Sequence, residues 1–326
     1  MISLWLPGHL ARLRLSYMTG GIESLHQAHQ LALRESPLYH LFWRLTDRVF
    51  PFTILIELGV DLNAQIGAQG LHHACRQVFE QLCVPIEVQL SAPHARQALT
   101  SPCLIYSNHT SMITPLILAA TLECPDLKIM AMRYVHNLLP NFRRSILPID
   151  RTWSHELFPA LNNGFAHLLA SLMLSYLEPR ASLTAARDQN QLILRQAAQH
   201  VLRGGATLIF PAGGVRRPAR WFPGIGAIVA HLLQARNQGV QGHAQARLPP
   251  LYLLPVCVHN DSNAHIRSGI IRNMEGTRQP GSEQPIRVEF AEPLSLEHLS
   301  GWERLSAQEI TFRLKDHYLR TLNPPG

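Results

Sequence analysis

The segment SNHTSMITPLIL, residues 107–118, places a histidine between one short apolar run and the start of another. CLIY at 103–106 precedes it and is typical of a buried strand. The Thr114-Pro115 pair predicts a helix start, with Thr114 as the cap and Pro115 in the first turn. This order of elements puts His109 at the carboxyl edge of a sheet, where α/β proteins bind ligands. The alternative is a purely structural histidine, one of 18 in the chain.

Strands and helices alternate on both sides of this segment. A helical region extends to about residue 84, and the turn-rich SAPHARQALTSP separates a strand at 86–90 from the one at 103–106. Further strands are predicted at 127–132, 145–150, 206–210, 251–258 and 286–294, with an arginine-bearing loop between the first two and helices over 165–177 and 188–202. The pattern indicates an α/β fold with a mixed, largely parallel sheet flanked by helices and a helical N-terminal region.

Chain length agrees with that organisation, since 326 residues suffice for one large α/β domain with an attached helical region, or for two average domains. We expect a helical N-terminal region over 1–84, an α/β domain over 85–300, and a C-terminal helix and tail over 301–326.

Composition excludes a disordered chain, because 46% of the residues are hydrophobic and only 16% are charged. The cationic residues are 27 arginines and two lysines, Lys128 and Lys315, and the formal net charge is +7. Arginine's planar fork suits phosphate oxygens, so an anionic membrane surface, a phosphorylated substrate or a nucleic acid is the expected partner. Nucleic acid is the least favoured of these, because the sequence contains no recognisable binding module. A solvated, arginine-rich face without a partner is the alternative.

The five cysteines form no C-x-x-C pair, which predicts reduced thiols and no bound metal. No apolar run reaches the length of a membrane-spanning helix. The first 18 residues lack the features of a signal peptide and predict either an interfacial helix on lipid or an ordinary helix interrupted by Pro7. A cytoplasmic protein that is peripherally associated with the membrane is therefore expected.

A second segment, TLIFPAGGVRRPARWFPGIGAIVAHLL at 207–233, has features suited to a phosphate. A strand leads into a glycine-rich turn with Arg216, Arg217 and Arg220, and Gly224 and Gly226 then open an apolar helix. Exposed N–H groups and guanidinium forks in one loop can bind phosphate oxygens. Neither a P-loop nor a dinucleotide fingerprint is present, and a loop with solvated arginines is the alternative.

Taken in order, five segments resemble the blocks of the glycerolipid acyltransferase family, which includes the lysophosphatidate acyltransferases. The resemblance covers roughly residues 85–295. SNHTSMITPLIL is similar to the N-H-x-x-x-x-D-P block, and the remaining segments are ILPIDR at 146–151, IFPAGG at 209–214, LLPVCV at 253–258 and VEFAEPLSL at 288–296.

The resemblance implies transfer of a fatty acyl group from a thioester of coenzyme A or acyl carrier protein to a hydroxyl of a lysolipid or a glycerol phosphate-like acceptor. No cofactor would be bound. His109 would be the general base, and Thr114 stands at the position of the family's aspartate. The residues implied in binding the substrate and its phosphate are Arg151, Gly213, Gly214, Arg216 and Arg217.

Two departures from the family pattern bear on activity. Thr114 supplies no negative charge to orient His109, and Asp150 or Asp261 could replace the missing acid in space. Ala212 stands where the F-P-E-G block has glutamate. The alternative is therefore a catalytically degenerate relative that binds lipid or a partner without turnover. A hydrolase with a nucleophile elbow is disfavoured, because no G-x-S-x-G occurs.

Overall fold

The structure is a computed structural model. The residues that it describes are 5–47, 52–111, 113–124, 126–150, 182–213, 220–241, 249–262, 265, 268–269 and 284–322. The chain forms two compact units, and each unit combines two separate stretches: Met1–Gln69 with Ala131–Asn190, and Gly70–Met130 with Gln191–Gly326. The division into 1–84, 85–300 and 301–326 stays a prediction.

The first unit is mainly helical, which confirms the helical N-terminal region. Its elements are α1 (Trp5–Glu35), α2 (Pro37–Asp47), α3 (Phe52–Gln69), α7 (Arg133–Leu138), the 3-10 helix η2 (Pro140–Ser145) and strand β4 (Ile146–Ile149). Helix α1 is interrupted at Gly21, whose φ of 68° suits glycine and whose Cα leaves no room for a side chain beside Pro140.

The segment between β4 and the preceding strand, β3 (Leu127–Met132), was expected to be a loop, and this expectation is wrong. It forms α7 followed by η2, because RYVHNL contains neither proline nor glycine and Pro140 occupies the first turn of the 3-10 helix.

His29 links two polar side chains inside this unit. Its Nδ1 lies 2.9 Å from the Tyr39 hydroxyl oxygen, and its Nε2 lies 3.1 Å from the Thr53 hydroxyl oxygen.

The second unit contains a sheet with strand order β1-β7-β6-β2-β5-β3, and β8 pairs with β6. Its strands, besides β3, are β1 (Ile86–Leu90), β2 (Cys103–Ser107), β5 (Ala206–Ile209), β6 (Tyr252–His259), β7 (Ile286–Phe290) and β8 (Leu294–Ser295). The pairs of β6 with β7 and with β8 are antiparallel, and the pairs β1-β7, β2-β6, β2-β5 and β3-β5 are parallel. The expectation of a mixed, largely parallel sheet is thus confirmed.

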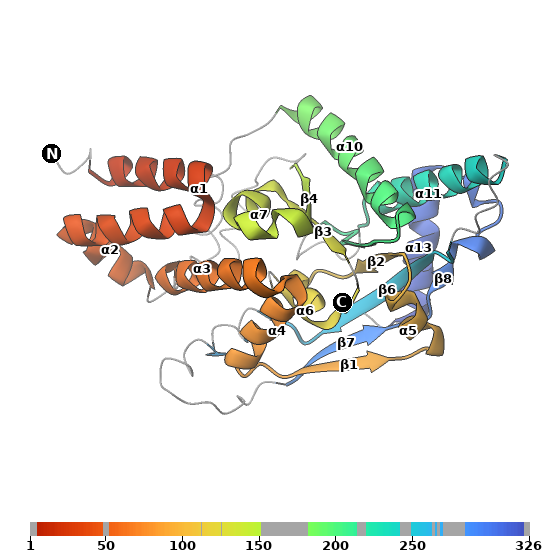
Figure 1. Cartoon of the computed structure of the whole chain (residues 1–326), viewed down its shortest axis with the longest axis horizontal. Coiled ribbons are helices and arrows are strands. Elements are labelled where there is room, and N and C mark those ends of the chain that lie inside the picture. The colour runs from red at the N-terminus through yellow and green to blue at the C-terminus, as the bar shows by residue number, and fades with distance from the viewer. Residues whose placement is uncertain are drawn as a thin grey trace. The chain divides into compact units, whose positions relative to one another are not determined.

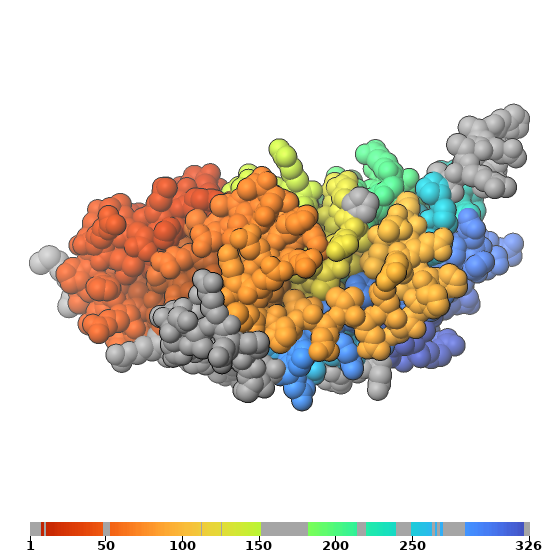
Figure 2. Space-filling model, turned by 60° about the horizontal axis from the view of Figure 1, so that its bottom comes forward, coloured from red at the N-terminus to blue at the C-terminus, as the bar shows by residue number. Residues whose placement is uncertain are grey.

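Helices cover this sheet. They are α4 (Leu71–Gln81), α5 (Pro93–Leu99), α6 (Thr114–Thr121), α11 (Gly224–Gln241), α13 (Ala307–Thr321) and α10 (Leu183–Leu202), which belongs to this unit from Gln191 onward. Helix α11 packs against α13, and α4 packs against α6 (Figure 1). Strand β2 is buried along its whole length, whereas β1 forms the sheet edge with Val88 exposed. The stretch from α4 through β1 to α5, in orange, lies at the surface in Figure 2.

Some predicted boundaries differ from those in the structure. The turn-rich segment before 103–106 contains α5, because Pro93 opens a run of helix-forming residues. The strand expected over 286–294 is divided into β7 and β8, since Pro293 has no N–H to donate to a ladder. Helix α10 starts at Leu183, before the expected 188, and the helix expected over 165–177 lies outside the described residues.

Gly226 sets how closely α11 approaches α13. Its N–H lies 3.2 Å from Thr311 Oγ1, and a Cβ at this position would overlap the carbonyl oxygen of Ala307. We expect Gly226→Ala to lower the free energy of unfolding by about 1–3 kcal/mol, because the helices must separate to admit the methyl group. Chemical denaturation measures the change. Gly224→Ala is the matched control, since its Cβ would lie 3.5 Å from Leu194 in ordinary contact. Equal stability of the two variants would contradict the expectation.

Candidate functional site

The candidate site forms where three parallel strands end together. Strand β2 lies between β6 and β5 and is parallel to both, so the three carboxyl ends meet at one edge of the sheet. His109 follows β2, Phe210 follows β5 and Asp261 follows β6. The structure therefore places His109 at the carboxyl edge, as expected, and brings it together with residues far away in sequence.

Asn108 fixes the backbone that enters this edge. Its side-chain amide donates to the carbonyl of Val258 at 2.8 Å, and its Oδ1 accepts from the Val258 N–H at 2.8 Å. These two bonds extend the pairing of β2 with β6 by one residue beyond the strand. The residue before His109 is thus held firmly by the neighbouring strand.

The His109 ring lies in an apolar environment. Its centroid is 4.6 Å from that of Phe210, and among the described residues Nδ1 has no hydrogen-bond partner. Burial lowers the pKa of His109 to about 4, and the backbone of Ser111 and the negative charge of Asp261 partly offset that effect. The imidazole is therefore neutral at pH 7 and able to accept a proton.

Thr114 does not cap α6, which corrects the expectation from the sequence. Ile113 is the N-cap residue and Pro115 lies in the first turn, as expected. Thr114 Oγ1 accepts a hydrogen bond from the N–H of Ser111 at 3.0 Å and donates to Oδ2 of Asp261 at 2.5 Å. The hydroxyl thus stabilises the preceding turn and binds a carboxylate from another strand.

Asp261 is the acid that forms hydrogen bonds with the residues following His109. The hydroxyl of Thr110 donates to Oδ1, while those of Ser111 and Thr114 donate to Oδ2 at 2.7 and 2.5 Å. The carboxylate is almost fully buried, and within the part of the chain that the structure describes no cationic side chain forms an ion pair with it. Three hydroxyls from the segment that carries His109 therefore hold this anion.

Asp150, the other acid considered, is engaged within the first unit. Its carboxylate accepts two hydrogen bonds from the guanidinium of Arg133, and its N–H donates to Asn190 Oδ1 at 2.7 Å. Because Arg133 already neutralises it, Asp150 serves a structural ion pair.

The glycine-rich turn after β5 is only partly described. Gly213 has a φ of 70°, and its N–H donates to the carbonyl of Phe210 at 2.9 Å. Four residues implied in substrate binding lie outside the described residues: Arg151, Gly214, Arg216 and Arg217. Their roles stay predictions. Among the residues described, no group of three or more His, Cys, Asp or Glu side chains could hold a metal ion.

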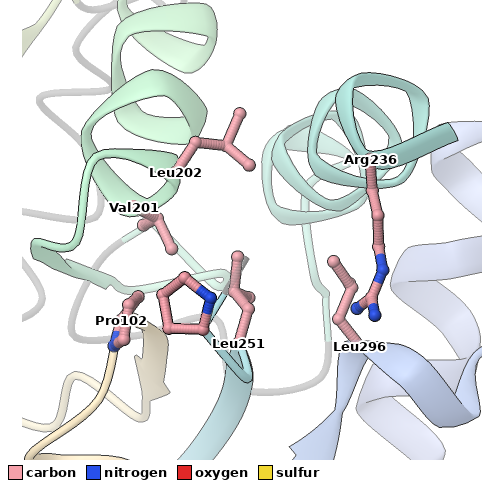
Figure 3. Close-up of a pocket in the computed structure, with 7 residues that line it drawn as sticks. Pro102, Val201, Leu202, Arg236, Leu251 and Leu296 are labelled. Atoms are coloured by element: carbon pink, nitrogen blue, oxygen red, sulfur yellow. The ribbon is translucent and has the colours of Figure 1, made fainter. Parts of the chain in front are cut away.

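A small, mainly apolar pocket lies at the opposite edge of the sheet from His109. Pro102 and Leu251, which precede β2 and β6, line it together with Val201, Leu202 and Leu296 (Figure 3). Arg236 of α11 also lines this pocket and forms an ion pair with Glu297 at 2.8 Å. The pocket adjoins the amino ends of the strands and contains none of the candidate site residues.

Sequence reasoning missed three residues of this cluster. Asn108, Thr110 and Ser111 flank His109 directly, and the concentration of hydroxyls in SNHTS was a signal that could have found two of them. Their partner could not be read in the same way, because 150 residues separate Ser111 from Asp261.

Comparisons with known proteins leave the family open. The chain matches no protein-family model and no curated protein sequence. A search of solved structures found the crystal structure of the 1-acyl-sn-glycerophosphate (LPA) acyltransferase PlsC from Thermotoga maritima, with 12% sequence identity, a TM-score of 0.36, and coverage of 83% of this chain and 81% of that one. Similarity at this level supports no inference of function, so the function rests on the residues of the site.

The lowered pKa of His109 makes stability depend on pH. The unfolded histidine, with a pKa near 6.5, binds a proton before the folded one, whose pKa is about 4. Protonation of His109 in the unfolded state therefore lowers the free energy of unfolding as the pH falls below 6.5, and the decrease reaches roughly 3 kcal/mol by pH 4. We expect His109→Gln to lose less stability than the natural protein between pH 7 and pH 4.5 in urea denaturation. His94→Gln, at an exposed histidine, is the control. Identical pH dependence of all three proteins would refute the burial argument.

Proposed function

We infer that this protein transfers an acyl group from a thioester to a hydroxyl of a lysolipid or a glycerol phosphate-like acceptor. One observation carries the proposal: a neutral, half-buried histidine lies at the carboxyl edge of a largely parallel sheet, within the field of a buried carboxylate. The order of the five sequence segments supports the same reaction. Coenzyme A or acyl carrier protein would carry the acyl group.

In the proposed reaction His109 acts as the general base. Its imidazole takes the proton of the acceptor hydroxyl, and the hydroxyl oxygen attacks the thioester carbonyl carbon. The resulting tetrahedral oxyanion collapses, the carbon–sulfur bond breaks, and the leaving thiolate receives the proton from the imidazolium. A general base must be unprotonated at the start, and the imidazole of His109 is neutral at pH 7. The negative charge of Asp261 would stabilise the imidazolium that forms.

The remaining roles follow from charge and position. The arginines Arg151, Arg216 and Arg217 would bind the phosphate of the acceptor, because guanidinium forks pair with phosphate oxygens. The N–H of Gly213 donates to the carbonyl of Phe210, and the N–H of Gly214 would serve as a donor for the oxyanion.

A second candidate is a protein of this fold that binds lipid without turnover. Two observations favour it: within the described residues Nδ1 of His109 has no hydrogen-bond partner, and burial holds its pKa far below the range of an efficient base at pH 7. The two candidates share the site and differ only in turnover.

We further propose that the first unit binds an anionic membrane surface. Four apolar side chains on α2 are exposed at helical spacing on one face: Leu38, Leu41, Phe42 and Leu45. Tyr39, Trp43 and Thr46 lie buried on the opposite face, and the exposed Arg44 could meet lipid phosphates. In the described residues no helix is both long and apolar enough to cross a bilayer. The exposed stripe is typical of a helix that lies on lipid.

Catalysis by His109 predicts loss of acyl transfer in His109→Ala. Purified protein is incubated with acyl-coenzyme A and a panel of lysolipids, and the acylated product is measured by mass spectrometry. We expect the rate to fall by roughly 10²–10⁴-fold, because general-base assistance is removed. His94→Ala, at an exposed histidine paired with Glu292, should keep the natural rate. Absence of product with every acceptor in the natural protein would favour the lipid-binding candidate.

Membrane binding through α2 predicts weaker association in Leu41→Glu. Leu41 is 53% exposed in the unit, and placing a carboxylate there removes about 2 kcal/mol of apolar burial in lipid. Flotation with vesicles rich in phosphatidylglycerol should show at least a roughly tenfold lower partition coefficient. Phe312→Glu is the control, since Phe312 on α13 is 70% exposed in the second unit. If both variants bind as well as the natural protein, α2 is not the contact surface.

A further inference from the structure

Asp261 is an unusual buried carboxylate. Carboxylates are rarely buried unless a cation or several hydrogen bonds compensate their charge. Here the compensation comes from the hydroxyls of Thr110, Ser111 and Thr114, and no ion pair neutralises the charge within the described residues. Among the described residues, its negative charge acts on His109 and Cys257.

Within the described residues, the titratable groups whose pKa responds to this charge are His109 and Cys257. Cys257 is a buried thiol on β6, and burial raises its pKa to about 12, so it stays protonated. His109 is unprotonated at pH 7, so it is the one of the two that can accept a proton from a substrate hydroxyl. Of these two groups, His109 is therefore the one whose proton transfer the charge of Asp261 can influence.

The carboxylate bound near His109 comes from a different sequence position than the family pattern predicts. In the resemblance to the glycerolipid acyltransferases, the acid belongs at position 114, five residues after the histidine. The structure has Thr114 there, and the Thr114 hydroxyl is bound 2.5 Å from Oδ2 of Asp261. A carboxylate is therefore present one hydrogen bond away from the expected place, delivered by the loop after β6.

We propose that Asp261 is the positioning residue for His109, and that the hydroxyls of Thr110, Ser111 and Thr114 hold its carboxylate where it balances the charge of the imidazolium. The inference rests on the proposed acyl transfer. A purely structural clamp between two turns would need hydrogen-bond acceptors but no uncompensated anion. The buried charge of Asp261 has no ion-pair partner among the described residues, is bound by the residues that follow His109, and acts on its imidazole, which favours the functional role.

The test exchanges the two side chains. Asp261→Asn keeps an acceptor oxygen for the hydroxyls and removes the charge. In the double variant Thr114→Asp, Asp261→Thr, the carboxylate moves to the start of α6, where a helix N-terminus tolerates an anion. Glu289→Gln is the matched control, because Glu289 is a partly buried carboxylate of the same unit that pairs with a different histidine, His259, at 3.1 Å.

Two measurements are made on each protein. Nuclear magnetic resonance of labelled histidine gives the pKa of His109, with its signal assigned by comparison with His109→Gln. Steady-state kinetics gives kcat and KM. We expect Asp261→Asn to lower the pKa of His109 further and to reduce kcat by about 10²–10⁴-fold with little change in KM. The exchange should restore the pKa and most of kcat, and Glu289→Gln should leave the pKa of His109 unchanged.

The outcomes separate this inference from the proposed reaction. If Asp261→Asn is folded and leaves both the pKa of His109 and kcat unchanged, Asp261 is only structural and the inference is wrong. Failure of a folded exchange variant to recover the pKa would also overturn it. If the natural protein transfers no acyl group at all, the proposed reaction fails, yet the resonance experiment still decides whether Asp261 acts on His109, because that measurement needs no substrate.

Discussion

The parallel pairing of β2 with β6 on one side and with β5 on the other is the constraint on which the candidate site depends. Parallel strands end at the same edge, so three loops that are distant in sequence emerge side by side. The amide of Asn108 extends the pairing beyond β2 and fixes the backbone of the next residue, His109. Without this arrangement His109 would have neither the ring of Phe210 nor the charge of Asp261 near it.

Burial and charge act on His109 in opposite directions, and burial has the larger effect. The apolar environment lowers its pKa to about 4, although Asp261 raises it. The imidazole of His109 is therefore unprotonated at pH 7, and its low pKa makes protonation unfavourable. Substrate binding that brings an anionic intermediate close would stabilise the imidazolium and oppose the effect of burial. In the proposed reaction, the apolar environment that keeps His109 neutral also opposes its protonation, and the charge of Asp261 acts against that effect.

Much of the fold was predictable because each element has a local signal. The apolar runs at β2, β5 and β6 and the Pro115 helix start were visible from periodicity and from proline chemistry. The errors occurred where tertiary contacts or short helices override weak signals. SAPHARQALTSP contains Pro and Ser at its ends but forms α5 between them, and Thr114 uses its hydroxyl for Ser111 and Asp261 and not for a cap.

The sequence by itself determined that a histidine follows a buried strand at the edge of an α/β sheet and that position 114 has no carboxylate. It could name Asp150 and Asp261 as acids at strand ends without choosing between them. Only the tertiary structure decided that Arg133 neutralises Asp150 and that Asp261 joins the turn of His109. The physical reason is that periodicity is a property of neighbouring residues, whereas the contact between Ser111 and Asp261 depends on the order of strands in the sheet, which no local pattern encodes.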